Sequence, residues 1–313
     1  MTIPLVQIKN IKKHFSLKQG ILKALDDLTF DIYPGETLGL VGESGSGKST
    51  LGKILLNLET PSEGEAYYAE KNLHKLKGLQ QKEIRKEIQV VFQDPYASLN
   101  PKMTVDEILK EPFEIHNIPF SKETIDELLT LVSLPPSCKN RFPYELSGGQ
   151  RQRVGIARAL ALKPKFLVCD EPISALDVSV GAQILNLLKK LQKELGLTIL
   201  FIAHDLRAVR YLSSRVAVLY LGQLMELSSV DDLYESPLHP YTKALLSAIP
   251  IPDPFLEKSR IKILLEGEIP NPLNPPKGCA FASRCPQAKD LCHKSRPSWR
   301  EVSPGRFTSC HFC

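Results

Sequence analysis

The sequence predicts an α/β protein whose core is a parallel sheet with crossover helices. Two short apolar runs, FLVCD at 166–170 and TILFIAH at 198–204, have the length and composition of buried strands. Between them, GAQILNLLKKLQKEL at 181–195 carries apolar residues at helical spacing. Strand, helix and strand in this order are typical of parallel strands joined by a crossover helix.

The remaining chain divides into segments of different character. Residues 1–35 have the pattern of short strands with turns, and the apolar run TLGLVG at 37–42 stops at a glycine as a buried strand does. KSTLGKILLNL at 48–58 then has helical spacing. We therefore expect one main domain over 1–235. A helical subdomain at about 94–160 and a proline-rich extension over 236–313 complete the organisation.

Composition and charge exclude several classes of protein. Of the 313 residues 42% are hydrophobic and 24% charged, which is ordinary for a globular protein. No apolar run approaches the roughly 20 residues that span a bilayer, and the first residues lack a secretory signal. The net charge of +5 is spread along the chain, and the charged stretch 73–88 is typical of a solvated helical face. We expect a cytoplasmic protein that binds no nucleic acid.

The stretch GESGSGKST fits the G-x-x-x-x-G-K-[ST] phosphate loop in full. It follows a predicted strand and opens a predicted helix, so its backbone N–H groups can surround an anion. Lys48 is expected to reach the β- and γ-phosphates, and the Ser49 hydroxyl to ligate Mg²⁺. The loop residues are Gly42, Glu43, Ser44, Gly45, Ser46, Gly47, Lys48, Ser49 and Thr50.

Polar residues follow three of the predicted strands. Asp170 and Glu171 end one apolar run and His204 ends another, while Gln93 terminates the run VVFQ. Ligands of open α/β sheets bind beyond the carboxyl ends of the strands. We assign Asp170 to the Mg²⁺ shell, Glu171 to the polarisation of an attacking water, and His204 to a γ-phosphate contact. We assign Gln93 to both the metal and the attacking water, which its amide can reach.

A second glycine-flanked helix start lies about a hundred residues after the loop. LSGGQ at 146–150 precedes the apolar positions Val154, Ala157 and Leu160, and SALD follows at 174–177. With these two motifs the chain resembles an ABC-type ATPase. The resemblance implies a P-loop NTPase (RecA-like) ABC cassette with a helical subdomain and a short cysteine-bearing C-terminal extension.

The resemblance also implies further nucleotide-binding residues and a partner cassette that carries a second nucleotide site. In the family, two cassettes pair head to tail, and the signature helix of one caps the γ-phosphate held by the other. It implies that Ser147, Gly148, Gly149, Gln150 and Asp177 contact the nucleotide, and that the ring of Phe15 stacks on adenine. It also implies ATP and Mg²⁺ as ligands and a hydrolytically competent site.

Several longer stretches resemble the cassettes of the oligopeptide, dipeptide and nickel importers. They include VVFQDPYASLNPKMTV, SPLHPYTKALLSAIP and GCAFASRCPQAKDLC. This resemblance implies two transmembrane permease subunits, a second ABC ATPase that in the family is usually a paralogue, and an extracytoplasmic substrate-binding protein. The chain would then lie at the cytoplasmic face of the cell membrane, as a peripheral subunit that powers peptide import.

Five of the seven cysteines fall after residue 278. Cys279, Cys285, Cys292 and Cys310 are separated by 5, 6 and 17 residues, and this spacing alone names no metal. Resemblance to importer cassettes with the same tail implies a [4Fe–4S] cluster on these four thiols. Zinc, or free cysteines in a poorly ordered tail, are the alternatives.

Three other functions stay open from the sequence. One is an importer cassette for nickel or another small solute, because selectivity resides in the permeases. Another is an exporter cassette. The last is a non-transport ABC ATPase that acts on ribosomes or DNA, although the chain has one cassette and no coiled-coil heptads.

Overall fold

The computed structural model describes residues 3–250, 253, 255, 257 and 262–313. It separates into two compact units. Tyr33–Thr37 and Lys75–Ile202 form most of the first unit, and the second contains Pro4–Ile32, Leu38–His74 and Ala203–Cys313. Each unit is described on its own.

The first unit is built on three parallel strands. β6 (Ile88–Val91) pairs with β7 (Phe166–Asp170), and β7 pairs with β8 (Thr198–Ile202). The 18-residue helix α7 (Val178–Leu195) connects β7 to β8 and buries Ile184, Leu188 and Leu191. The strand–helix–strand order expected from the apolar runs is thus confirmed within this unit.

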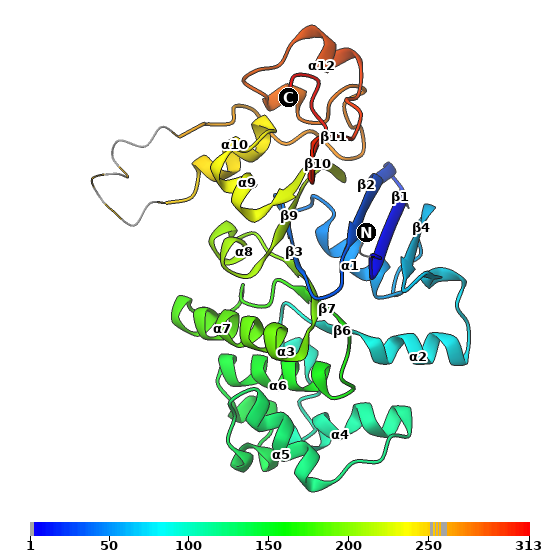
Figure 1. Ribbon diagram of the computed structural model, residues 1–313, viewed down its shortest axis with the longest axis vertical. Coiled ribbons are helices and arrows are strands. Elements are labelled where there is room, and N and C mark those ends of the chain that lie inside the picture. Colours follow the sequence, from blue (N-terminus) through cyan, green and yellow to red (C-terminus); the bar gives the residue numbers. More distant parts are fainter. Residues whose placement is uncertain (1–2, 251–252, 254, 256, 258–261) are drawn as a thin grey trace. The chain divides into compact units, whose positions relative to one another are not determined.

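Helices make up the rest of the first unit (Figure 1). They are α2 (Leu79–Glu87), α3 (Pro95–Ser98), α4 (Val105–His116), α5 (Lys122–Leu131) and α6 (Gly148–Leu160). Thr104 and Ser121 start α4 and α5 with capping boxes, in which side chain and backbone satisfy each other's polar groups. α6 packs against α3, α4, α5 and α7. The helical character expected for 94–160 is therefore present.

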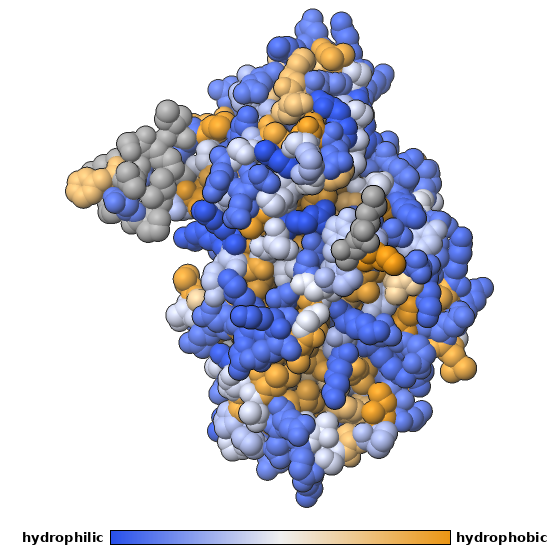
Figure 2. Space-filling model, in the orientation of Figure 1, coloured by the Kyte–Doolittle hydropathy of each residue, from blue (hydrophilic) through white to orange (hydrophobic). Residues whose placement is uncertain are grey.

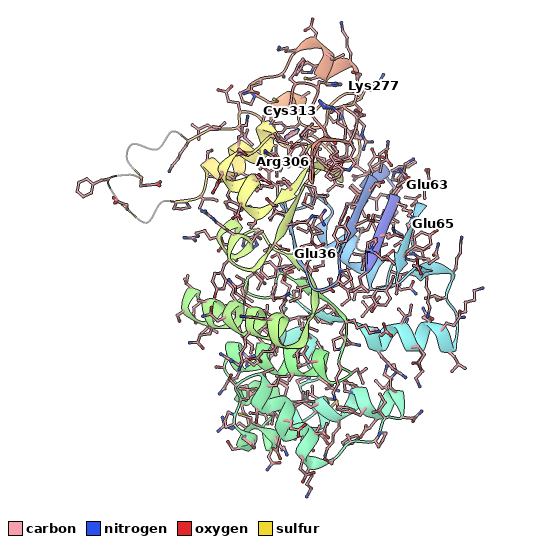
Figure 3. The ribbon with its side chains drawn as sticks, in the orientation of Figure 1. Glu36, Glu63, Glu65, Lys277, Arg306 and Cys313 are labelled. Atoms are coloured by element: carbon pink, nitrogen blue, oxygen red, sulfur yellow. The ribbon has the colours of Figure 1, made fainter. Side chains whose placement is uncertain are left out.

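The second unit contains an antiparallel sheet in the order β2-β1-β4-β5. Its strands are β1 (Val6–Leu17), β2 (Gly20–Ile32), β4 (Glu63–Tyr68) and β5 (Lys71–Asn72). A 2.6 Å ion pair joins Glu63 on β4 to Lys12 on β1. Glu63 and Glu65, both on β4, mark this strand in Figure 3. The expectation of short strands was wrong, because β1 and β2 are 12 and 13 residues long. Register shifts along β1 interrupt the two-residue alternation that would reveal one long strand.

The second sheet of this unit has the order β11-β12-β10-β9-β3. β3 (Thr37–Val41) runs parallel to β9 (Arg215–Tyr220), which pairs with β10 (Gln223–Ser229). The C-terminal segment then adds β12 (Arg306–Thr308) and β11 (Arg300–Ser303). Residues 300–308 of the cysteine-bearing extension are thus hydrogen-bonded to the sheet that carries the phosphate loop.

Short helices complete the second unit. α1 (Lys48–Leu55) follows the phosphate loop, and α8 (Leu206–Leu212), α9 (Val230–Glu235) and α10 (Pro240–Ser247) follow β8 and the strands of this unit. A 3₁₀ turn (Ala282–Arg284) and α12 (Asp290–Lys294) lie among the cysteines of the extension. Within the described residues, no helix combines the length and apolarity needed to cross a membrane. Hydrophilic side chains cover much of the face seen in Figure 2.

Candidate nucleotide-binding site

The phosphate loop connects β3 to α1 and depends on two glycines whose φ angles lie in the left-handed region. Gly42 has a φ of +153°, and a Cβ there would lie 2.1 Å from the carbonyl oxygen of Leu219. Gly47 has a φ of +103°, and its Cβ would lie 2.4 Å from the carbonyl oxygen of Ala24. A side chain at either position would collide with backbone that cannot yield. The loop therefore has its shape because glycine occupies these positions.

Lys48 closes the loop from its helical end. The side chain is buried, and its Nζ donates to the carbonyls of Gly42 and Glu43 at 2.8 and 3.0 Å. Ser44, Gly45 and Ser49 are exposed. The hydroxyl of Ser46 is buried without a hydrogen-bond partner among the described residues. A buried ammonium in a glycine-rich loop at a helix N-terminus is the arrangement that favours a polyanion.

The extension reaches the phosphate loop at Glu43. Arg284 donates to both carboxylate oxygens of Glu43, at 2.9 and 3.1 Å. The hydroxyl of Tyr241 accepts a hydrogen bond from the Glu43 amide at 3.1 Å. The sequence analysis missed these contacts, because Arg284 and Glu43 are 241 positions apart and no motif links them.

Two further predicted residues lie in the second unit. Phe15 is half-buried on β1, and the ammonium of Lys13 lies 4.8 Å from the centre of its ring. His204 is exposed in the short connection between β8 and α8, next to Asp205, whose carboxylate caps α8 at the amide of Arg207. Neither position is buried in the core, so both side chains are accessible.

In the first unit the structure brings Glu171 and Gln93 together. The Nε2 of Gln93 donates to Oε2 of Glu171 at 3.1 Å. Glu171 follows Asp170 at the end of β7, and its amide donates to the carbonyl of Ile202 at 2.9 Å. Its φ of +47° is left-handed, which is uncommon for a residue with a side chain. A left-handed residue of this kind persists only where its surroundings hold it.

The helix start at Ser147 is a complete capping box. Ser147 Oγ accepts from the Gln150 amide at 3.3 Å, and the Gln150 side chain accepts from the Ser147 amide at 3.0 Å. Ser147 itself is exposed at the surface of the first unit. Arg151 secures the same turn by donating to the carbonyl of Leu146 at 2.6 Å. The helix that follows buries Val154, Ala157 and Leu160, as the apolar spacing predicts.

The two glycines of this turn have a packing role that the sequence did not reveal. A Cβ at Gly149 would lie 2.4 Å from Cγ1 of Val180, at the start of α7. A Cβ at Gly148 would lie 3.3 Å from Cδ2 of Leu176. Gly149 therefore lets α6 approach α7, in addition to any role at the helix start.

Asp177 caps α7 with its carboxylate. The carboxylate accepts from the Val180 amide at 2.9 Å and from the Ser179 hydroxyl at 2.8 Å. These hydrogen bonds hold the pKa of the Asp177 carboxyl below its usual value, with the Val180 amide as the largest cause. The residue is thus ionised and fixed beside the turn that contains Gly149.

The four predicted cluster cysteines meet in one place. Cys279, Cys285, Cys292 and Cys310 all line a cavity of about 20 Å³, together with His239 and Phe281. Burial raises the pKa of Cys279 to about 11. All seven cysteines are free thiols. Among the described residues no group of three or more Cys, His, Asp or Glu is placed to hold a metal ion, so the predicted cluster is not supported by this arrangement.

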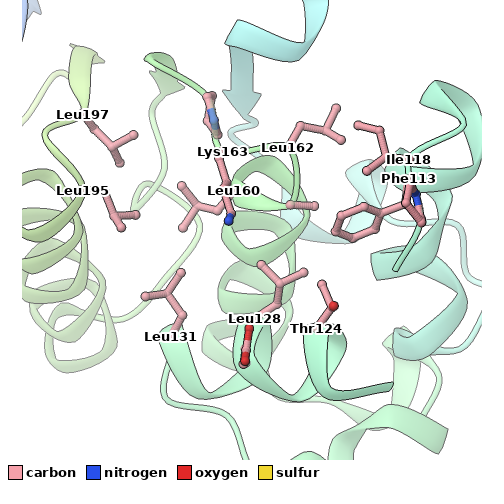
Figure 4. A pocket seen from close by; sticks show the side chains of 14 residues that line it. Phe113, Ile118, Thr124, Leu128, Leu131, Leu160, Leu162, Lys163, Leu195 and Leu197 are labelled. Atoms are coloured by element: carbon pink, nitrogen blue, oxygen red, sulfur yellow. The ribbon is translucent and has the colours of Figure 1, made fainter. Parts of the chain in front are cut away.

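A larger groove of about 850 Å³ lies within the first unit and carries none of the predicted site residues. Leu128, Leu131, Leu160 and Leu195 point into it, with Lys163 above them (Figure 4). Its wall is mostly apolar and comes from α4, α5, α6 and the end of α7. The groove is separate from the motifs described above.

An α/β scaffold with a phosphate loop at one helix start and a Ser-Gly-Gly cap at another defines an ATP-binding cassette protein. Residues 25–174 match the family model of the ABC transporter, and residues 225–292 match that of the oligopeptide/dipeptide transporter C-terminal region. The chain belongs to the ABC transporter family, in the group of oligopeptide and dipeptide transport ATP-binding proteins.

Individual relatives and solved structures agree with this assignment. The putative oligopeptide transport ATP-binding protein YkfD of Bacillus subtilis is 57% identical over 99% of this chain and 95% of its own length. OppF of Haemophilus influenzae, an oligopeptide transport ATP-binding protein, is 51% identical over 97% of this chain and 93% of its own length. A dimeric post-hydrolysis state of the ATP-binding cassette MJ0796, bound to ADP and Pi, has a TM-score of 0.66. It is 35% identical and covers 72% of this chain and 98% of that chain.

Gly149 and Gly155 of α6 have different surroundings, and their substitution tests the packing role of Gly149. Gly149→Ala should lower the free energy of unfolding, because its Cβ would meet Val180 at 2.4 Å. Gly155→Ala, whose Cβ meets nothing within 4 Å, should raise it by about 0.5–1 kcal/mol through helix propensity. Urea unfolding would measure both. Equal effects of the two substitutions, or failure of Val180→Ala to rescue Gly149→Ala, would contradict the packing role.

Proposed function

We propose that this chain is the ATP-hydrolysing subunit of an ABC importer that carries peptides across the cytoplasmic membrane. The observation that carries the proposal is the phosphate loop, folded between β3 and α1 with Lys48 buried across it. The chain is similar over nearly its full length to oligopeptide transport ATP-binding proteins, and this similarity supports peptide as the cargo. The division into a cassette over 1–235 and an extension over 236–313 is part of the same proposal.

The roles of the individual residues follow from their chemistry. The amides of the phosphate loop and Lys48 bind the β- and γ-phosphates of ATP. Ser49, Asp170 and Gln93 would hold Mg²⁺, which would neutralise charge on the phosphates. Glu171 accepts a proton from the attacking water, and His204 contacts the γ-phosphate. Phe15 stacks on adenine.

The helix start at Ser147 acts on a second cassette. Ser147 is exposed and begins α6, so a neighbouring cassette can bring its γ-phosphate to this helix start. Gly148, Gly149, Gln150 and Asp177 complete this contact. The two cassettes of the dimer close on each other when ATP binds and separate after hydrolysis. The second cassette is a paralogue or a second copy of this chain.

The membrane parts of the system are other chains. Two permease subunits span the membrane and bind this chain at the cytoplasmic face, and an extracytoplasmic binding protein delivers the peptide. The chain is then a peripheral subunit, and its ATP cycle drives the permeases between inward and outward access.

Removal of the proposed general base tests the catalytic assignment. In the assembled membrane complex, Glu171→Gln should still bind MgATP but lose about 10²–10⁴-fold in hydrolysis, because the amide cannot take the proton from water. Peptide uptake into vesicles should fall with it. Glu194→Gln, an exposed acid on α7 of the same unit, is the matched control and should leave both rates unchanged. Near-normal turnover of Glu171→Gln would refute the role of Glu171.

A pair of serine caps tests the contact with a second cassette. Ser147→Ala and Ser121→Ala each remove one capping-box hydroxyl, so each should cost about 1 kcal/mol of local helix stability. Only Ser147→Ala should also slow ATP hydrolysis by the assembled complex, because Ser121 lies outside the signature. Steady-state phosphate release measures this. If both variants slow hydrolysis equally, the effect is one of stability and the contact proposal fails.

We further propose that Cys279, Cys285, Cys292 and Cys310 hold a [4Fe–4S] cluster that braces the extension. Four thiols on one cavity are the donor set that a soft metal centre prefers. The cavity of about 20 Å³ has room for about one water molecule, so the side chains must move apart when a cluster binds.

Metal analysis decides the cysteine proposal. Protein purified without oxygen should contain about four irons per chain and absorb in the visible region. Cys292→Ser should remove both signals, whereas Cys138→Ser, at a buried cysteine of the first unit, should keep them. Zinc in place of iron, or no metal in the anaerobic protein, would overturn the proposal.

A further inference from the structure

The phosphate loop contains an acidic residue at its second position. Glu43 follows Gly42 directly, and its amide and carbonyl belong to the turn that Lys48 closes. A carboxylate in this place repels the phosphates of ATP, and the repulsion is strong where water is partly excluded. The charge of Glu43 must therefore be balanced if the loop is to bind a polyanion well.

Arg284 supplies that balance from the C-terminal extension. One guanidinium nitrogen donates to both oxygens of Glu43, at 2.9 and 3.1 Å. The Arg284 side chain is 10% exposed and that of Glu43 is 24% exposed, so the pair is largely shielded from solvent. Charge-assisted hydrogen bonds of this kind are stronger and more directional than those between neutral groups.

A cluster of aromatic rings holds Arg284 and the loop together. Arg284 also donates to the hydroxyl of Tyr220, at 3.4 Å. The rings of Tyr220 and Tyr241 are 4.7 Å apart, and Phe281 of the extension lies 5.3–5.4 Å from each of them. All three side chains are fully buried. A rigid aromatic platform thus fixes both the Tyr241 hydroxyl, which accepts from the Glu43 amide, and the guanidinium.

We propose that Arg284 is a positioning residue for ATP binding. It neutralises Glu43 and, with Tyr241, fixes the first turn of the phosphate loop, so that the extension raises the affinity of the loop for MgATP. The inference rests on the proposed role of the loop as the ATP phosphate site. Arg284 itself does not touch the nucleotide.

A second ion pair of the extension supplies the matched control. Arg296 donates to the side chain of Asp26 at 3.0 Å and to its carbonyl at 2.7 Å. It therefore ties the extension to the middle of β2, as Arg284 ties it to the loop, but in the described part of the chain its hydrogen bonds and ion pair do not involve residues 42–50. A role limited to anchoring the extension predicts similar effects from the two arginines.

The test is a double-mutant cycle on the full chain, read as the Kd of MgATP by calorimetry. Arg284→Met keeps the apolar stem and removes the charge, and it should raise the Kd about five- to tenfold, equivalent to about 1–1.4 kcal/mol. Glu43→Gln, a change within the loop itself, gives the reference Kd for the double variant. The double variant Arg284→Met/Glu43→Gln should bind nearly as well as Glu43→Gln alone, because no unbalanced carboxylate is left. Arg296→Met should have no effect.

The outcomes separate this inference from the proposed function. If Arg284→Met weakens binding and Glu43→Gln does not rescue it, or if Arg296→Met weakens binding equally, Arg284 only supports the fold and the inference is wrong. Should Arg284→Met fail to fold, Arg284→Lys keeps the charge and should stay within about twofold of the wild type; a larger loss would equally overturn the inference. If Lys48→Ala binds MgATP normally, the proposed function itself fails.

Discussion

Close approach of backbone to backbone around the phosphate loop is the constraint on which the second unit depends. The loop passes so near the carbonyls of Leu219 and Ala24 that only glycine fits at 42 and 47. Further hydrogen bonds join the same segments: the amide of Gly222 donates to the carbonyl of Ser46 at 2.9 Å, and the amide of Asp26 to that of Gly222 at 2.8 Å. The position of the amides that face an anion is thus set by the end of β9 and by β2. Any change that moves these strands moves the loop.

Local patterns predicted the parts of the chain that local physics determines. The apolar run before Gly42, the helix after it and the strand–helix–strand order at 166–202 were all readable, because each depends on neighbouring residues. Gln93 and Glu171 lie within hydrogen-bond distance because both follow strands that are paired in parallel. The length of β1 was hidden by its register shifts. The contact between Arg284 and Glu43 could not be predicted, since its partners are 241 positions apart and arginines are too common in the sequence to be a signal.

The signature turn shows how one short motif can serve two purposes. Within the chain, Ser147 and Gln150 satisfy each other, Arg151 holds the carbonyl of Leu146, and Gly149 admits Val180. These contacts fix the direction of the first amides of α6 without using all of them, because a helix start leaves four N–H groups without helical partners. A preorganised helix start needs little further ordering to receive an anion, so binding there loses little entropy. The packing role and the proposed role at the interface therefore support each other.

The extension is a structural part of the unit that carries the phosphate loop. β12 lengthens the sheet next to β10, and Phe281 packs on two tyrosines, one of which contacts the loop amide of Glu43. Arg284 immediately precedes Cys285, one of the thiols on the small cavity. Because Cys285 is the next residue in the chain, any rearrangement of the cysteines that moves the backbone at 285 also moves the backbone that carries the guanidinium. On its own, an acidic residue in a phosphate loop would oppose the binding of a polyanion. Because Glu43 is paired with Arg284, a structural change in the extension is expected to alter the affinity of the loop for ATP.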